Sequence, residues 1–148
     1  MDNRDALKLE NQICFALYAC SREITKLYRP MLEELELTYT QYVTMLALWE
    51  QDRVSVTALG NKLYLDSGTL TPLLKKLEAA GHLTRTRDRS DERIVIVELT
   101  DQGKALKERA SGIPAQLACK LNGTPEEAAA LLGQMREFLN RLQTSTAE

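Results

Sequence analysis

The middle third of the sequence constrains the fold of this chain more than any other part. Ser55 is a favourable N-cap for a short helix over residues 56–63. A tight turn at residues 64–66 leads to a second helix over residues 67–80, and Gly81 is placed to end that helix as a C′ glycine. Two short helices joined by a tight turn are typical of a helix-turn-helix.

Two predicted strands follow this pair of helices directly. Residues 83–87 and 94–99 are both short, and the second segment, IVIVEL, is rich in β-branched side chains, which favour strands. The polar residues 88–93 between them predict a hairpin turn. A hairpin immediately after a helix-turn-helix is a wing, so the sequence predicts a winged helix-turn-helix.

Helices are expected on both sides of this block. Apolar residues recur at helical spacing over residues 6–35, which predicts a long helix that is bent or interrupted near Pro30. A second helix is expected over residues 39–51. Together with the helices after the hairpin, this makes the fold class mainly α with a small β-hairpin wing.

The segment after the hairpin predicts two further helices. Thr100 is the expected cap of a helix that reaches Leu121 with a kink at Pro114. Thr124, with proline next and glutamate three residues on, is a strong start signal for a last helix that ends near Leu142.

The helices outside the winged block are predicted to form a dimer. Residues 1–148 are expected to be one domain, with the winged helix-turn-helix at about residues 38–99. Segments 1–35 and 100–148 carry long apolar stripes with little else to bury them, so we expect an obligate homodimer through these helices. The second helix of the helix-turn-helix, over residues 67–80, is the recognition helix of such a fold, and its two copies in the dimer would lie about one DNA turn apart, roughly 34–36 Å, on a pseudo-palindromic site.

The helix over residues 67–80 has the composition of a helix that enters the major groove. Leucines occupy one face, and small, hydroxyl and cationic side chains occupy the other. Small residues allow close approach, hydroxyl groups can bond to bases or phosphates, and lysines pair with phosphates. The candidate contacts are Ser67, Gly68, Thr69, Thr71, Pro72, Lys75 and Lys76. The same pattern also fits an ordinary amphipathic helix with a solvated lysine face.

Arginines in the hairpin favour DNA binding over that simpler interpretation. The further candidate contacts are Arg85, Arg87, Arg89 and Arg93. Arg89 at the tip is the expected minor-groove contact, because the negative potential of that groove attracts arginine. Arg93 is expected either to contact DNA or to brace the loop with Asp91. Residues 53–93 are net positive, whereas both flanking segments are net negative, which fits one surface that faces a polyanion.

The cysteines, the apolar residues and the single histidine exclude several other classes of protein. Three cysteines are an odd number without CxxC spacing, which indicates reduced thiols in a cytoplasmic protein and neither a disulfide scaffold nor a zinc site. We also expect no metal and no cofactor. A membrane partner is not expected either, because no apolar stretch approaches the roughly 20 residues that a membrane-spanning helix needs. His82 is the single histidine and is expected to be a hinge or phosphate-side residue. The sequence therefore offers no histidine as the base of a nucleophile–base pair, and we do not expect an enzyme.

Several segments of the chain are characteristic of one protein family. They are LYLDSGTLTPLLKKLEAAGHLTR at 63–85, Asp91-Glu92-Arg93 in the wing, and Leu99-Thr100. These motifs and the order of the elements resemble the MarR family of winged-helix regulators over nearly the whole chain. Within that family, KLENQICFALYACSREITKLYRPML at 8–32 and TYTQY at 38–42 resemble the organic hydroperoxide resistance regulators.

The resemblance implies a repressor of a peroxide-detoxification gene that binds a pseudo-palindromic operator in double-stranded DNA. An organic hydroperoxide would oxidise a first-helix cysteine, here Cys14, and release the protein. Tyrosine hydroxyls at the positions of Tyr18 and Tyr28 would hydrogen-bond this thiol across the dimer. A cysteine near the position of Cys119 would form a disulfide with the partner's oxidised cysteine, whereas one-cysteine members form mixed disulfides or overoxidise.

The residues around Cys14 give limited support of their own, because a free cysteine on a helix is by default a small packed hydrophobe. Tyr18 at i+4 shares a helix face with Cys14, whereas Tyr28 is about 21 Å along the axis and can reach the thiol only from the partner chain. Cys14 is expected about three turns inside its helix, so tyrosine hydroxyls are better activators than the helix dipole. Cys20 is expected to be a packing residue.

Two other functions remain open at this point. A MarR-type repressor released by a small phenolic ligand would leave Cys14 merely packed, and a thiol peroxidase would use it in turnover. Release of DNA by phenolic compounds but not by peroxide would indicate the first. Turnover of peroxide with excess thiol, without DNA binding, would indicate the second.

Overall fold

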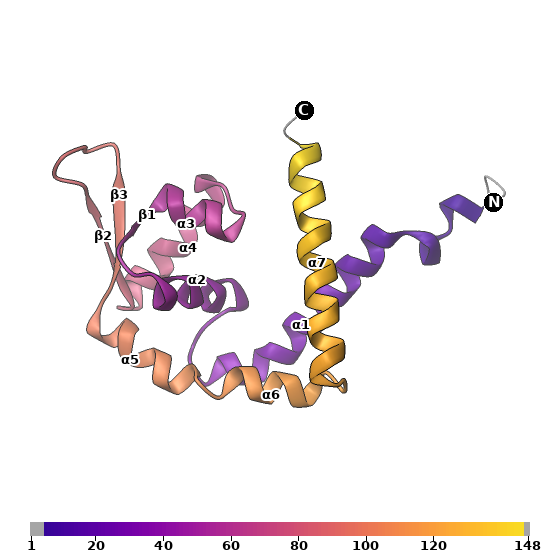
Figure 1. The fold of residues 1–148 in the computed structure, drawn as a ribbon. Helices are drawn as coiled ribbons and strands as arrows, with labels where there is room; N and C mark the ends of the chain where they lie inside the picture. The colour runs from indigo at the N-terminus through magenta and orange to yellow at the C-terminus, as the bar shows by residue number, and fades with distance from the viewer. Residues whose placement is uncertain (1–4, 147–148) are drawn as a thin grey trace. The chain divides into compact units, whose positions relative to one another are not determined.

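Residues 5–146 are described by a computed structural model, whose ribbon is drawn in Figure 1. The chain forms two compact units, one that ends at Ile113 and one that begins at Pro114. Within the described residues, no helix is long and apolar enough to cross a membrane.

The first helix, α1, spans Ile13–Glu33 and follows two 3-10 turns at Asp5–Leu7 and Leu9–Asn11. The prediction that this helix begins near residue 6 is therefore wrong. The amide side chains of Asn11 and Gln12 donate to backbone carbonyls within the two turns, at 2.6 to 3.0 Å. Such local side-chain bonds compete with helical pairing of the backbone, which explains the late start.

Pro30 lies inside α1 and does not interrupt it, contrary to one of the two expectations for this position. A proline leaves the carbonyl four residues earlier without its helical partner. That carbonyl belongs to Lys26, and both residues lie on an exposed part of the helix, where water is available to the carbonyl. The helix ends at Glu33, and Glu36 then adopts a left-handed conformation with φ of 55°.

The helix-turn-helix forms where the sequence predicts it. Helix α2 spans Tyr39–Glu50, α3 spans Val56–Leu63 and α4 spans Ser67–Ala79. The hydroxyl of Ser55 caps α3 by accepting a hydrogen bond from the N–H of Ala58 at 3.0 Å. Gly81 follows α4 with φ of 86°, the left-handed conformation expected of a C′ glycine.

A three-stranded antiparallel sheet in the order β1-β3-β2 carries the wing. Strand β2 spans Leu83–Arg87 and pairs with β3, which spans Val95–Leu99. The third strand, β1 at Val54–Ser55, pairs with β3 and has no counterpart among the predicted elements. Asp52 fixes this edge, because its Oδ1 accepts a hydrogen bond from the N–H of Leu99 at 2.9 Å.

The core of the first unit lies where α4 meets α2, α3 and β2. Leu70, Leu74 and Leu77 are fully buried, as the sequence predicts, and Val97 of β3 is buried with them. Burial of this leucine face fixes the rotation of α4 about its axis and leaves the opposite face in solvent.

The expectation of one kinked helix after the wing is wrong. Helix α5 spans Asp101–Ala110 and α6 spans Ile113–Lys120, so the break precedes Pro114. Pro114 lies in the first turn of α6, where its missing N–H would have had no helical acceptor. Helix α5 is held against α2 by Trp49, whose Nε1 donates to the carbonyl of Gly103 at 2.9 Å.

The last helix, α7, spans Pro125–Ser145 and begins with the predicted cap. The hydroxyl of Thr124 accepts from the N–H of Glu127 at 3.1 Å, and the Glu127 carboxylate accepts from the N–H of Thr124 at 2.8 Å. Leu131, Leu132 and Leu142 of this helix are about half exposed, at 57%, 50% and 49%. The helix therefore carries apolar side chains that this single chain does not bury.

Candidate DNA-binding surface and thiol site

The solvent face of α4 presents the side chains predicted to contact DNA. Asp66 caps this helix, because its Oδ1 accepts from the N–H of Thr69 at 2.7 Å, and hydrogen bonds from Thr69 hold the pKa of Asp66 below its usual range. Thr71 is half-buried. The exposed members of the predicted set are Ser67, Gly68, Thr69, Pro72, Lys75 and Lys76.

Arg85, predicted as a DNA contact, is instead engaged beneath the wing. Residues of a strand alternate between its two faces, and Arg85 is in register with the buried Val97. Its backbone N–H donates to Glu78 Oε2 at 2.9 Å and its Nη2 donates to Glu78 Oε1 at 3.1 Å. These bonds hold the pKa of the Glu78 carboxyl below its usual range. Arg85 therefore braces the wing against the end of α4.

Two other arginines stabilise the loop at the tip of the wing. Arg93 forms a bidentate ion pair with Asp91, with distances of 3.0 and 3.1 Å, as in the bracing alternative, yet its side chain remains 90% exposed. Arg87 donates to the carbonyl of Glu92 at 2.7 Å. Both guanidinium groups thus shape the loop and still lie at its surface.

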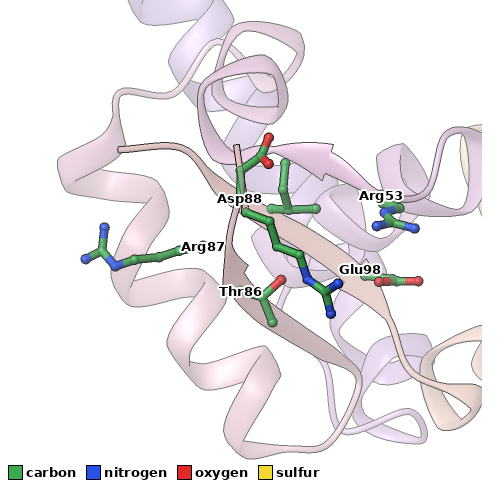
Figure 2. Close-up of a pocket in the computed structure, with 7 residues that line it drawn as sticks. Arg53, Thr86, Arg87, Asp88 and Glu98 are labelled. Carbon is green, nitrogen blue, oxygen red and sulfur yellow. The ribbon is translucent and has the colours of Figure 1, made fainter. Parts of the chain in front are cut away.

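A cleft of about 630 Å³ lies on the outer face of the wing and is lined in part by Arg89, the predicted tip contact. Arg53, Asp88 and Glu98 also line it. In Figure 2, Arg87 extends to the left, away from Arg53 and Glu98. Arg53 is a cation that the sequence reasoning missed, because only the pairing of β1 with β3 brings it to this face.

His82 lies buried at the junction of α4 and β2, with 7% of its surface exposed. The burial rules out the expected phosphate-side role. The carbonyl of His82 accepts from the N–H of Thr100 at 3.1 Å, and a Cβ at Gly103 would collide with that carbonyl. Burial and then the charge of Arg109 lower the pKa of His82, and Glu36 opposes them weakly.

Cys14 is the second residue of α1, so the expectation that it lies about three turns inside the helix is wrong. The N-cap residue Gln12 makes no side-chain bond to this helix end, and the first N–H groups have no helical acceptor. The thiol is exposed. The structure therefore places Cys14 in the N-terminal turn of α1, the end of a helix that carries partial positive charge.

Tyr18 follows Cys14 by about one turn of α1 and is also exposed. Its Oη accepts a hydrogen bond from Arg22 Nη1 at 2.7 Å, and the guanidinium carbon of Arg22 lies 5.5 Å from the Tyr18 ring centroid. Arg22 is a second residue that sequence reasoning missed, although its i+4 spacing from Tyr18 is a signal for such a contact.

Tyr28 packs at the far end of α1 from Cys14 of the same chain. Its ring centroid lies 4.9 Å from that of Tyr39 and 5.6 Å from that of Tyr42. Burial raises the pKa of Tyr28 to about 12, so its hydroxyl remains a donor at neutral pH. Since α1 is continuous, the separation from Cys14 is about 21 Å along the axis, and Tyr28 cannot reach that thiol within one chain.

The other two cysteines are also free and exposed. Cys20 does not pack against other residues of its own chain, so the expectation that it is a packing residue stays a prediction. Cys20 is six residues after Cys14 on α1, and a disulfide between them requires the helix to unwind. Cys119 lies near the end of α6. Over residues 5–146, no group of three His, Cys, Asp or Glu side chains could hold a metal ion.

Comparison with known sequences identifies transcriptional regulators as relatives of this chain. The profile described as transcriptional regulator SarA/Rot matches residues 26–110. The chain is 47% identical over 143 residues to the organic hydroperoxide resistance transcriptional regulator of Bacillus subtilis (strain 168). The matched residues make up 96% of this chain and 95% of that relative.

Solved structures show the same fold. The chain matches reduced AbfR bound to DNA with a TM-score of 0.77 at 32% identity, over 94% of this chain and 96% of that one. AbfR is a protein of Staphylococcus epidermidis. The disulfide form of AbfR matches with a TM-score of 0.64 at 34% identity, over 95% and 96% of the two chains. The predicted fold class is confirmed, and the chain belongs to the SarA/Rot group of MarR-like winged-helix transcriptional regulators.

Proposed function

We propose that this chain is a homodimeric, redox-sensing repressor that leaves its operator when an organic hydroperoxide oxidises Cys14. The observation that carries the proposal is the exposed Cys14 thiol in the uncapped first turn of α1, in a chain with a winged helix. The relatives support both parts: one is named for organic hydroperoxide resistance, and AbfR is known both reduced on DNA and in a disulfide form.

In this proposal α4 enters the major groove and the wing tip enters the minor groove. The proposed contacts are Ser67, Gly68, Thr69, Thr71, Pro72, Lys75 and Lys76 on α4, with Arg87, Arg89 and Arg93 in the wing. Arg89 is the main wing contact, because Arg87 and Arg93 already brace the loop. Arg85 is left out, since Glu78 holds it beneath the sheet.

The proposed dimer is formed by the segments at the two ends of the chain, with residues 38–99 as the DNA-binding region between them. Apolar side chains at both ends are exposed: Leu7 at 87%, Leu9 at 61% and Ile13 at 63% in the first segment, and three leucines of α7 in the last. Soluble proteins rarely leave such clustered apolar surface uncovered. A second copy of the chain, which carries the same surfaces, is the proposed occupant.

The proposed signal is a two-electron oxidation of sulfur. The Cys14 thiol attacks the terminal oxygen of the hydroperoxide, the O–O bond breaks, and the products are a sulfenic acid and an alcohol. The thiol of Cys119 of the partner subunit then displaces hydroxide from the sulfenic sulfur, which forms a disulfide and water. The terminal helices move, the spacing of the two recognition helices changes, and the phosphate contacts are lost together.

The proposal is tested with an operator selected from a random duplex pool by the reduced protein. Fluorescence anisotropy of the labelled operator should show release when cumene hydroperoxide is added, and rebinding after dithiothreitol. Salicylate should have no effect. Release by salicylate but not by hydroperoxide would contradict the redox mechanism and indicate a ligand-responsive repressor.

The proposed disulfide is tested separately by non-reducing electrophoresis. Hydroperoxide should produce a covalent dimer in the wild type and in Cys20→Ser, the control that also removes an exposed thiol, but not in Cys119→Ser. A dimer band that persists in Cys119→Ser and disappears in Cys20→Ser would assign the resolving thiol to Cys20 instead.

A further inference from the structure

We propose that helix α5 is a strut that carries a displacement of α1 to the end of α4, and that Arg109 is the residue through which α1 acts on this strut. The inference rests on the proposed function, in which oxidation of Cys14 moves the terminal helices and thereby the two copies of α4. It assigns a role to Arg109, which belongs neither to the DNA-binding surface nor to the thiol site.

The N-terminal end of α5 holds the joint between α4 and β2, which consists of Ala80, Gly81 and His82. Gln102 Nε2 donates to the carbonyl of Ala80 at 3.2 Å, and Thr100 Oγ1 donates to that of Gly81 at 2.5 Å. The N–H of Thr100 donates to the carbonyl of His82 at 3.1 Å. Three donors at one end of α5 therefore bind the three successive carbonyls with which α4 ends.

Close packing makes this attachment rigid. A Cβ at Gly103, in the first turn of α5, would collide with the carbonyl of His82, so the helix and the joint touch without a side chain between them. The carbonyl of Gly103 accepts from Trp49 Nε1, which ties α2 to the same turn. Because closely packed elements move together, a tilt of α5 displaces the end of α4.

The other end of α5 is attached to α1 through Arg109. This residue lies in the last turn of α5, and its Nη2 donates to the carbonyl of Glu34 at 2.7 Å. Glu34 is the C-cap residue of α1, at the end of a helix where carbonyls have no helical donor and carry partial negative charge. A guanidinium donor makes a stronger hydrogen bond there than a neutral group does.

The two attachments lie at opposite ends of one short helix. The ten residues of α5 span about 15 Å, so the helix moves as one body. Over residues 5–146, the bond from Arg109 is the one side-chain hydrogen bond between α5 and the end of α1. A displacement of α1 that moves the Glu34 carbonyl therefore tilts α5 and shifts the carbonyls that end α4. Without Arg109, Cys14 can be oxidised while α4 keeps its place.

The test compares the operator affinity of the full-length protein before and after oxidation, by fluorescence anisotropy with the selected operator. Cumene hydroperoxide oxidises the protein, and non-reducing electrophoresis verifies that the covalent dimer has formed. Reduced Arg109→Gln should bind the operator like the wild type. Its increase in Kd on oxidation should be at least about fivefold smaller, the lower end of the usual coupling between two sites. Arg109→Lys should recover part of the increase, because lysine keeps a charged donor.

Lys107→Gln is the matched control, because it removes the other exposed cation from the last turn of α5. It should respond to oxidation like the wild type. Burial and then the charge of Arg109 lower the pKa of His82, so all variants are measured at about pH 8, where this histidine is neutral with or without Arg109. Where reduced Arg109→Gln binds the operator weakly, Arg109→Met, which keeps an unbranched side chain, replaces it in the same comparison.

Three results would overturn the inference. One is an Arg109→Gln protein whose Kd rises on oxidation as much as that of the wild type, which would show that α1 acts on α4 by another route, such as its packing against α2. Another is an equal loss of response in Lys107→Gln. The third is an Arg109→Gln protein that forms no covalent dimer, which would place the effect of Arg109 on the oxidation itself. If, instead, the wild type bound the operator equally well before and after oxidation, the proposed function itself would fail, whatever the effect of Arg109.

Discussion

His82 lies where the recognition helix ends and the wing begins, and its imidazole has almost no contact with solvent. Its Nδ1 is buried and has no hydrogen-bond partner among the described residues. A buried imidazole with Arg109 nearby is costly to protonate, because both burial and the neighbouring charge disfavour the cation. The joint between recognition helix and wing is therefore built around a neutral histidine.

Acidification is expected to weaken this joint. The pKa of His82 lies below its ordinary value in the folded chain. At pH values between the folded and the unfolded pKa, the unfolded chain therefore binds a proton that the folded chain does not. The stability that this difference supplies is complete above about pH 6.5 and is lost as the pH falls below that value. Urea unfolding of the wild type and His82→Gln at about pH 8 and about pH 5.5 should show the wild type losing more stability. A pH dependence that is the same in both proteins would contradict this role.

The setting of Cys14 shows how far a single residue could be predicted. The sequence indicates a helical cysteine with Tyr18 on the same face, and the structure confirms both on α1. The sequence does not reveal that Cys14 lies in the first turn, since the apolar period continues through Leu7 and Leu9. Those leucines lie in the two 3-10 turns before α1 and are exposed at 87% and 61%, and they belong to the surface that we propose for the dimer.

An ion pair between Glu78 and Arg85 couples the wing to α4. Glu78 lies near the end of α4 and receives both the backbone N–H and the guanidinium of Arg85. The two side chains are 37% and 22% exposed. The pair therefore fixes the orientation of β2 relative to the helix that we propose to lie in the major groove.

Glu78→Gln is expected to weaken this coupling. The loss of charge should reduce the free energy of unfolding by about 1 kcal/mol, the upper range for a partly exposed pair. It should also lower operator affinity, because the wing loses its fixed position. Glu50→Gln, which removes the exposed ion pair with Lys62, is the control and should change neither quantity measurably. Equal effects of the two substitutions in urea unfolding and anisotropy would contradict the bracing role.

Elements with local signals could be predicted, and those that depend on distant partners could not. The caps at Ser55 and Thr124 and the glycine at 81 locate three helix ends within a few residues. Strand β1 has two residues and exists only because β3 pairs with it, so no local pattern marks it. The candidate site follows the same rule. The solvent face of α4 could be predicted from the spacing of its buried leucines. The bond between Glu78 and Arg85 could not be predicted, because it joins two separate elements.

At the scale of the whole molecule, the proposed dimer accounts for the exposed apolar side chains of α7. Leu131, Met135 and Leu142 recur on one face of this helix and are 57%, 38% and 49% exposed. A regulator with two recognition helices gains affinity from simultaneous binding to two half-sites. Dimer formation and tight operator binding should therefore be lost together.

Leu131→Glu combined with Leu142→Glu should produce a monomer in sedimentation equilibrium. The charged side chains cannot be buried against a second copy without a large desolvation cost. Operator affinity should fall at least about 100-fold, because one half-site alone remains. Gln134→Glu, which adds a charge at an exposed position of the same helix, should remain a dimer. A double variant that is still dimeric would remove α7 from the proposed interface.

We propose that oxidation of Cys14 controls DNA binding, and operator anisotropy with Cys14→Ser is the decisive experiment. The reduced variant should bind the operator as tightly as the wild type, since Cys14 lies outside the DNA-binding surface. On addition of cumene hydroperoxide, the wild type and Cys20→Ser should be released, while Cys14→Ser should remain bound. Release of Cys14→Ser at the same hydroperoxide concentration as the wild type would contradict the claim.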